Sequence, residues 1–151
     1  QLVEDGKIRY WGVSNFDHLA LADLRDVPGS GGLATDQVLY NLSRRGPEYD
    51  LLPWCADHRI PVMAYSPIEQ GRILHDATLN DVAAGHIVSP AAAALAWVLR
   101  RDSLCAIPKA SSPQHVRDNA TALEVELTCE DLDALDRAFP PPSGPRPLEM
   151  L

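Results

Sequence analysis

Short apolar stretches alternate with helical segments along the whole chain, and this alternation constrains the fold most. Four stretches are predicted as strands because they are rich in apolar or β-branched residues and bounded by Gly, Asp or Pro: Ile8–Val13, Thr35–Tyr40, Pro61–Tyr65 and Leu104–Ile107. They lack clean polar alternation, which predicts strands covered on both faces. Strict alternation with helices predicts parallel strands joined by helical crossovers. Such an α/β pattern can close as an open doubly wound sheet or as a barrel, and the alternation does not choose between them.

Helices are expected between and after these strands, at Asp17–Asp26, Glu48–His58, Leu79–Ala84, Pro90–Arg101 and Ser112–Leu123, with a last one from Thr128. Ser89 before Pro90 is a typical N-cap, and Thr128 with Asp131 resembles a capping box. The prolines that follow Phe139 exclude a helix, so residues 140–151 are predicted as an extended surface segment. We therefore expect one domain over residues 1–139 and a proline-rich tail over 140–151.

Charge and cysteine content exclude several classes of partner. The 151 residues carry a formal net charge of −8, which argues against nucleic acid and against an anionic membrane surface. The longest nearly apolar stretch, Ala91 to Leu99, is too short to span a bilayer. Three separated cysteines and histidines without metal-binding spacing predict no metal and suit a reducing cytoplasm. Residue 1 is Gln rather than Met, which is compatible with a missing start.

Polar, aromatic and cationic residues recur where the predicted strands end. The first strand leads into Ser14 and Asn15, the second carries Gln37, the third ends at Tyr65 and Ser66, and the fourth is followed by Lys109. Amides, hydroxyls, a ring and a lysine suit binding of a planar polar group and an anion better than acid–base catalysis. Each residue also has a plain structural interpretation: helix cap, packing at the barrel rim, or solvated surface lysine.

An anion site is predicted where the helix after the fourth strand begins. Ser112 and Pro113 open that helix, whose free N–H groups and dipole favour a phosphate. Lys109 lies just before it, and Arg117 and Asn119 follow in its next turns. No strand is followed by the G-x-G-x-x-G pattern of the doubly wound dinucleotide fold.

At these positions the sequence resembles the aldo-keto reductase family. Gly12-Val13-Ser14-Asn15-Phe16 is similar to the family's fifth strand, and Asp36-Gln37-Val38 to its sixth. Pro61 to Pro67 is similar to the seventh strand, and Ile107 through Asn119 to the eighth strand and following helix. The resemblance covers essentially the whole chain. It implies half of a TIM (β/α)₈ barrel, namely the C-terminal half with strands five to eight.

The resemblance also implies a cofactor, NADP(H), with NAD(H) as a second candidate, and a role for each matching residue. Ser14, Asn15 and Gln37 would bind the nicotinamide carboxamide, and Tyr65 would stack on the ring. Ser66 and Ile68 would lie along the pyrophosphate. The adenosine end would be held by Lys109 and Ser111 at the 2′-phosphate, with Asp118 and Asn119 at the adenine.

Two positions depart from the family pattern at the phosphate. His115 replaces an arginine of many members, and Ala110 replaces a serine. Histidine lacks the fixed fork of arginine and is largely neutral at pH 7. We therefore expect a weaker preference for NADP(H) than is typical, with NAD(H) partly tolerated.

The family's catalytic Asp, Tyr, Lys and His belong to the first four strands, which the resemblance places outside this chain. The expected activity of the intact enzyme is reduction of an aldehyde or ketone to an alcohol, and no catalytic residue is expected here. The alternative is a non-catalytic nucleotide-binding or subunit-like module. Open edges at the first and last strands predict that the isolated chain is partly disordered, self-associates, or pairs with a complementary half barrel.

Overall fold

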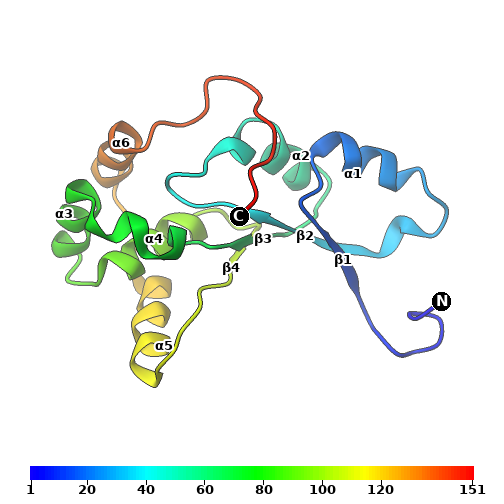
Figure 1. Ribbon diagram of the computed structural model, residues 1–151, viewed down its shortest axis with the longest axis horizontal. Helices are drawn as coiled ribbons and strands as arrows, with labels where there is room; N and C mark the ends of the chain where they lie inside the picture. Colours follow the sequence, from blue (N-terminus) through cyan, green and yellow to red (C-terminus); the bar gives the residue numbers. More distant parts are fainter.

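The computed structural model describes residues 1–151 as a four-stranded sheet packed against helices (Figure 1). The strands are β1 (Trp11–Ser14), β2 (Leu33–Leu39), β3 (Val62–Tyr65) and β4 (Leu104–Ala106). The helices are α1 (His18–Arg25), α2 (Leu51–Asp57), α3 (Ala77–Gly85), α4 (Pro90–Leu99), α5 (Pro113–Ala120) and α6 (Cys129–Ala138). Four 3₁₀ segments, η1 (Ser30–Gly32), η2 (Gly46–Glu48), η3 (Glu69–His75) and η4 (Thr121–Glu124), complete the fold.

All three strand pairs are parallel, and the sheet order is β1-β2-β3-β4, which confirms the predicted parallel crossovers. Sequential strands are neighbours, as they are in a barrel. Ser14 is paired with Gln37, and Leu39 with Tyr65. The carboxyl ends of the strands therefore lie along one edge of the sheet.

One face of the sheet carries the core. Val38, Val62 and Ala64 are buried in a cluster with Trp97 of α4 and Leu51 of α2. Alternate residues of the same strands, such as Gln37, Met63 and Tyr65, point to the other face and are only half-buried. The expectation that both faces are covered therefore holds for one face only, and the second is open, as expected for part of a barrel.

Helices start at side-chain caps, of which Ser89, Ser112 and Thr128 were predicted and Asp76 was not. Asp17, Asp76, Ser89, Ser112 and Thr128 each accept a hydrogen bond from a backbone N–H in the first turn of the helix that follows. The reciprocal bonds between Thr128 and Asp131 make a complete capping box. These side chains use donors that the helix itself leaves free, which explains why starts of this kind are predictable.

The first strand differs from its prediction. Residues 8–10 lie outside β1 because its partner begins only at Leu33, opposite Trp11, which leaves them nothing to pair with. Gly12 lies so close to Thr35 that an added Cβ would approach that residue's carbonyl oxygen to 2.7 Å. The register shifts beside it, between Trp11 and Val13.

Four predicted helical segments also differ from the structure, and the helix predicted from Leu79 to Ala84 extends from Ala77 to Gly85. The segment predicted as Glu48–His58 is broken, because the 3₁₀ turn η2 ends before Asp50 caps α2. The segment predicted as Ser112–Leu123 changes from α to 3₁₀ geometry at Thr121, and the segment predicted as Pro90–Arg101 ends at Leu99. The turn η3 was not predicted at all, since left-handed residues interrupt it and no apolar periodicity marks it.

A buried ionic cluster fixes the loop after β2. Glu48 accepts hydrogen bonds from Tyr40, from Arg45 and from Arg100. Both guanidinium groups also lie over the ring of Trp97, at 4.9 and 3.8 Å. The cluster ties this loop to α4 and to the sheet.

No single helix is long and apolar enough to cross a membrane; α3 and α4 meet that test only together, and they are bent by 87° at their junction. No three His, Cys, Asp or Glu side chains gather in a way that could hold a metal ion. All three cysteines are free.

Asp36 is the exception among the buried charges. It is fully buried on β2, and neither carboxylate oxygen has a hydrogen bond of good geometry. Burial raises its pKa to about 6, although the backbone N–H groups of Phe16 and Gln37 lie close enough to offset part of that rise. In the unfolded chain the same carboxyl titrates near 3.8. The folded state therefore loses stability as the pH rises from about 4 to about 6, and the loss persists above that range.

Replacing this carboxyl by a neutral amide tests that conclusion. Asp36→Asn should stabilise the protein by up to about 3 kcal/mol at pH 8, because about two pKa units are removed. The gain should vanish near pH 4, where Asp36 is already neutral. Urea unfolding at both pH values measures it, and Asp133→Asn on the exposed side of α6 is the control. A gain of equal size at both pH values would contradict the assigned cause.

Candidate functional site

The candidate site lies along the edge where the four strands end. The parallel register brings Ser14 beside Gln37 and places Tyr65 one strand further along. The Ser14 hydroxyl donates to the backbone oxygen of Gln37 at 2.9 Å. The Tyr65 hydroxyl donates to the Oδ1 atom of Asn15 at 3.2 Å, so the ends of β1 and β3 are connected across the end of β2. The structure therefore brings together the four residues predicted for the ring end of the site.

Left-handed backbone marks two of these strand ends. Asn15 has a φ of 58° and Ser66 a φ of 47°. Asn tolerates this region, whereas Ser in it is uncommon and must be held there by its surroundings. The carbonyl of Ser66 accepts a 2.9 Å hydrogen bond from Asn41, which supplies part of that restraint. Backbone conformations of this kind gather at binding sites.

A cavity of about 520 Å³ continues the site from β3 towards β4. It is lined by Ser66, Pro67, Ile68, Gln70, Gly71, Ile107 and Lys109. Three residues predicted for one ligand, Ser66, Ile68 and Lys109, thus share one space although they come from two strand ends. The exposed ammonium of Lys109 is the only charged group in the lining.

A second, open depression lies at the start of α5, where Ser111, Ser112 and Arg117 line it. Ser112 caps the helix by accepting from the N–H of His115 at 3.2 Å. Ser111 contacts the Nδ1 atom of His115 at 3.3 Å. The start of α5, the Ser111 hydroxyl and the Arg117 guanidinium therefore share this depression, whereas Lys109, also predicted for the anion, lines the 520 Å³ cavity instead.

Three residues predicted for the adenosine end line neither space, namely His115, Asp118 and Asn119. Asp118 accepts a hydrogen bond from Gln114 along the surface of α5, and Asn119 is half-buried on the same helix. Neither lines the cavity or the depression, whereas Arg117 does. One step along a helix turns a side chain by about 100°, so membership of a motif does not fix which residue faces the site.

Sequence reasoning missed the residues that shape the loop after β3. Gln70 and Gly71 form part of the cavity wall, and Glu69 beneath them is buried and ionised. The one available signal was Gly71 itself, four residues after Pro67, which is typical of a turn. Asn41 was not predicted as a site residue, yet its side chain joins the loops after β2 and β3.

The groups at this edge define the ligand chemistry that the site can serve. The amides of Asn15 and Gln37 and the hydroxyl of Tyr65 can orient a planar polar ring. Lys109, Arg117 and the N–H groups at the start of α5 can bind an anion. Beside these groups, the Ser111 hydroxyl and the His115 imidazole contact each other at 3.3 Å.

Comparison with known proteins finds a match to one family over most of the chain. Residues 1–139 match the profile of the Aldo/keto reductase family. Over the whole chain the sequence is 48% identical to a protein of Escherichia coli (strain K12) named methylglyoxal reductase YeaE, of which it covers 55%. It is 33% identical to a glyoxal reductase of Bacillus subtilis (strain 168), of which it covers 54%.

Solved structures give the same result for the fold. A Klebsiella pneumoniae aldo/keto reductase in complex with NADP and acetate superposes with a TM-score of 0.96 at 45% identity, covering 99% of this chain and 55% of that one. A Klebsiella pneumoniae aldo-keto reductase in complex with NADPH gives a TM-score of 0.94 at 46% identity, with the same coverage. The chain therefore spans about half the length of the relatives it matches.

Proposed function

The chain belongs to the aldo/keto reductase family, and we propose that it is the cofactor-binding half of an enzyme that reduces aldehydes or ketones to alcohols with NADPH. One observation carries the proposal: residues from all four strand ends meet along one edge, with a ring-orienting group at β1–β3 and a cationic group at β4–α5. NADPH has a group for each of these two, a planar nicotinamide ring at one end and a phosphorylated ribose at the other.

In this proposal the cofactor lies along the edge from β1 to α5. Ser14, Asn15 and Gln37 bind its carboxamide, and Tyr65 stacks against the nicotinamide. Ser66 and Ile68 lie along the pyrophosphate in the 520 Å³ cavity, where their strand end is already held. The chemistry supplied by the bound cofactor is hydride donation to the carbonyl carbon, and the chain's own residues orient the donor.

At the adenosine end, Lys109, Ser111 and Arg117 are the residues proposed to bind the 2′-phosphate, with His115 held beside Ser111. Asp118 and Asn119 remain candidates for the adenine only if α5 turns on binding. Both nicotinamide cofactors occur among relatives, since an Escherichia coli protein at 32% identity is named NADH-specific methylglyoxal reductase.

We further propose that the chain supplies strands five to eight of the barrel and that the catalytic tetrad lies on a complementary half. The open face of the sheet supports a missing cover, because Gln37, Met63 and Tyr65 are only half-buried on it, although the sequence of these strands predicts two covered faces. An in-frame coding stretch upstream with four further strand–helix units would support this assignment. Cooperative melting of residues 1–151 alone, as a monomer in sedimentation, would contradict it.

A small carbonyl compound is the proposed substrate. Two relatives are named as reductases of methylglyoxal and glyoxal, so methylglyoxal is the first compound to assay. We keep the cytoplasm as the proposed location, because three free cysteines suit a reducing compartment. The competing proposal, a nucleotide-binding module without chemistry, predicts cofactor binding without turnover of any carbonyl.

Tyr65 provides the direct test of the ring end. In the protein as its gene encodes it, Tyr65→Leu should raise the Kd for NADPH roughly tenfold, because the stacking surface and the bond to Asn15 are lost. Quenching of tryptophan fluorescence measures the Kd. Tyr49→Leu, on an exposed ring that lines neither the 520 Å³ cavity nor the depression at α5, should leave it unchanged. Equal effects of the two changes would refute the assigned ring site.

Lys109 tests the phosphate end. Lys109→Met should weaken NADPH binding about tenfold and leave NADH binding nearly unchanged, because only the former carries a 2′-phosphate. The difference should shrink at high salt. Lys7→Met, which removes the chain's other lysine, is the matched control. If the wild-type protein binds both cofactors with equal affinity at moderate salt, Lys109 contributes nothing to selection.

A further inference from the structure

The guanidinium group of Arg44 connects the loop after β3, which contains Glu69, to the proline-rich segment, residues 140–151. Arg44 donates to Glu69 through Nε at 3.2 Å and Nη2 at 3.1 Å. Its third nitrogen, Nη1, donates to Glu149 of the proline-rich segment at 2.8 Å. A single side chain therefore bridges two segments that are about 80 residues apart in sequence.

Glu69 is the inner member of this chain of contacts. It is 3% exposed, and its two oxygens accept from Arg44, Arg72 and Asn41. Burial pushes its pKa up, but the hydrogen bonds from Arg44 and Asn41 outweigh this and hold the pKa below its usual value. The carboxylate thus stays charged inside the protein and needs each of these partners.

The loop that contains Glu69 forms the wall of the 520 Å³ cavity. Ser66, Pro67, Ile68, Gln70 and Gly71 all line that space, while Glu69 between them points inward and holds the loop from below. Three of the loop's non-glycine residues, Ser66, Glu69 and Gln70, have positive φ. Such a conformation costs free energy and persists only while side-chain contacts enforce it.

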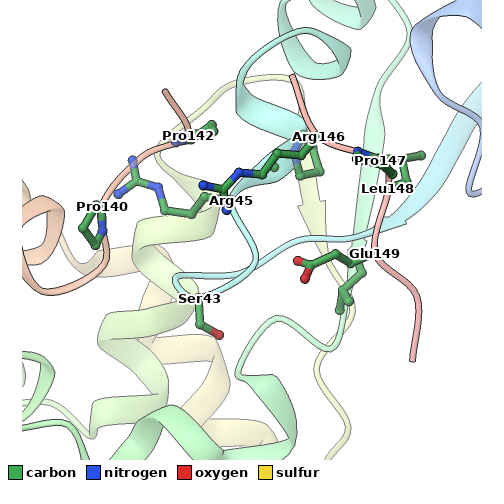
Figure 2. Close-up of a pocket in the computed structure, with 11 residues that line it drawn as sticks. Ser43, Arg45, Pro140, Pro142, Arg146, Pro147, Leu148 and Glu149 are labelled. Carbon is green, nitrogen blue, oxygen red and sulfur yellow. The ribbon is translucent and has the colours of Figure 1, made fainter. Parts of the chain in front are cut away.

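The proline-rich segment is held to the rest of the chain at few points. It arches from α6 back to the sheet (Figure 1), and a cavity of about 420 Å³ separates it from the loop after β2. Figure 2 shows Arg146 and Glu149 at this cavity, with Glu149 on the side of the Ser43–Arg45 loop. Leu148, which precedes Glu149 in the sequence, packs against the core. Because these contacts are few, the hydrogen bond between Arg44 and Glu149 is a substantial part of what keeps the segment in place.

We propose that Glu149 acts, through Arg44 and Glu69, as a positioning residue that keeps the loop after β3 closed on the cofactor and so slows cofactor release. The inference rests on the proposed function for the identity of the ligand. The contact between segment and loop does not depend on it. Release of the proline-rich segment frees one side of Arg44, weakens the restraint on Glu69 and lets the loop relax from its left-handed conformation.

The test uses the protein as its gene encodes it, with NADPH as the probe. Glu149→Gln should raise the NADPH dissociation rate about threefold, the size expected for one partly exposed ion pair. Glu69→Gln should raise it roughly tenfold, since a buried ion pair is lost. The KM for methylglyoxal should not change in either variant. In an Arg44→Met background, Glu149→Gln should have no further effect.

Hydrogen exchange of the backbone amides of residues 66–72, measured without cofactor, separates this inference from the proposed function. Glu149→Gln should increase exchange there. Asp136→Asn is the matched control, because it breaks the 2.7 Å pair with Arg45 but touches no residue of that loop. It should change neither exchange in residues 66–72 nor the dissociation rate.

The hydrogen-exchange and dissociation measurements test separate parts of the inference. Unchanged exchange in Glu149→Gln overturns the coupling, whatever the protein binds. Increased exchange with an unchanged NADPH dissociation rate overturns its role in release. If the wild-type protein does not bind NADPH but exchange still rises in the variant, the proposed function fails and the coupling between segment and loop stands.

Discussion

The in-register parallel pairing of β2 with β3 is the constraint on which the rest of the structure depends. It fixes Gln37 beside Met63 and Leu39 beside Tyr65, so it determines both which side chains reach the core and which reach the strand ends. A slip of one residue would exchange the two faces and turn Val38 outward. The core on one face and the candidate site at the edge are therefore consequences of the same register.

Much of the fold could be predicted because its signals are local. A cap such as Ser89 or Thr128 satisfies backbone donors within its own first turn, so neighbouring residues contain the information. The first strand was predicted too long because its length depends on where a partner begins, at Leu33, 22 residues away. The 3₁₀ turn at Glu69–His75 escaped prediction since it is maintained by contacts with Asn41 and Arg44 rather than by its own periodicity.

The candidate site likewise contains residues that could be predicted from the sequence and residues that could not. Ser14, Gln37 and Tyr65 were predictable as a group because parallel strands bring their carboxyl ends to one edge whatever the details of packing. Asp118 lies on a helix, where the neighbouring Arg117 faces the depression instead. Supporting residues such as Asn41 were invisible as supports, because a buried amide is recognised by its partners, and these come from a different loop.

Arg44 and Arg45 are adjacent in the loop after β2, but one contacts the wall of the cavity and the other contacts the core. Arg45 turns to Glu48 and the ring of Trp97, and so joins the loop to the core. Arg44 turns to Glu69, at the wall of the cavity. Burial alone would push the pKa of both glutamates up. The arginine, together with Tyr40 at Glu48 and with Asn41 at Glu69, brings the pKa below its usual value instead. Each carboxylate therefore stays charged because these partners are in place. Loss of the Arg45 contacts should loosen the core, whereas loss of the Arg44 contacts should loosen the cavity wall and leave the core intact.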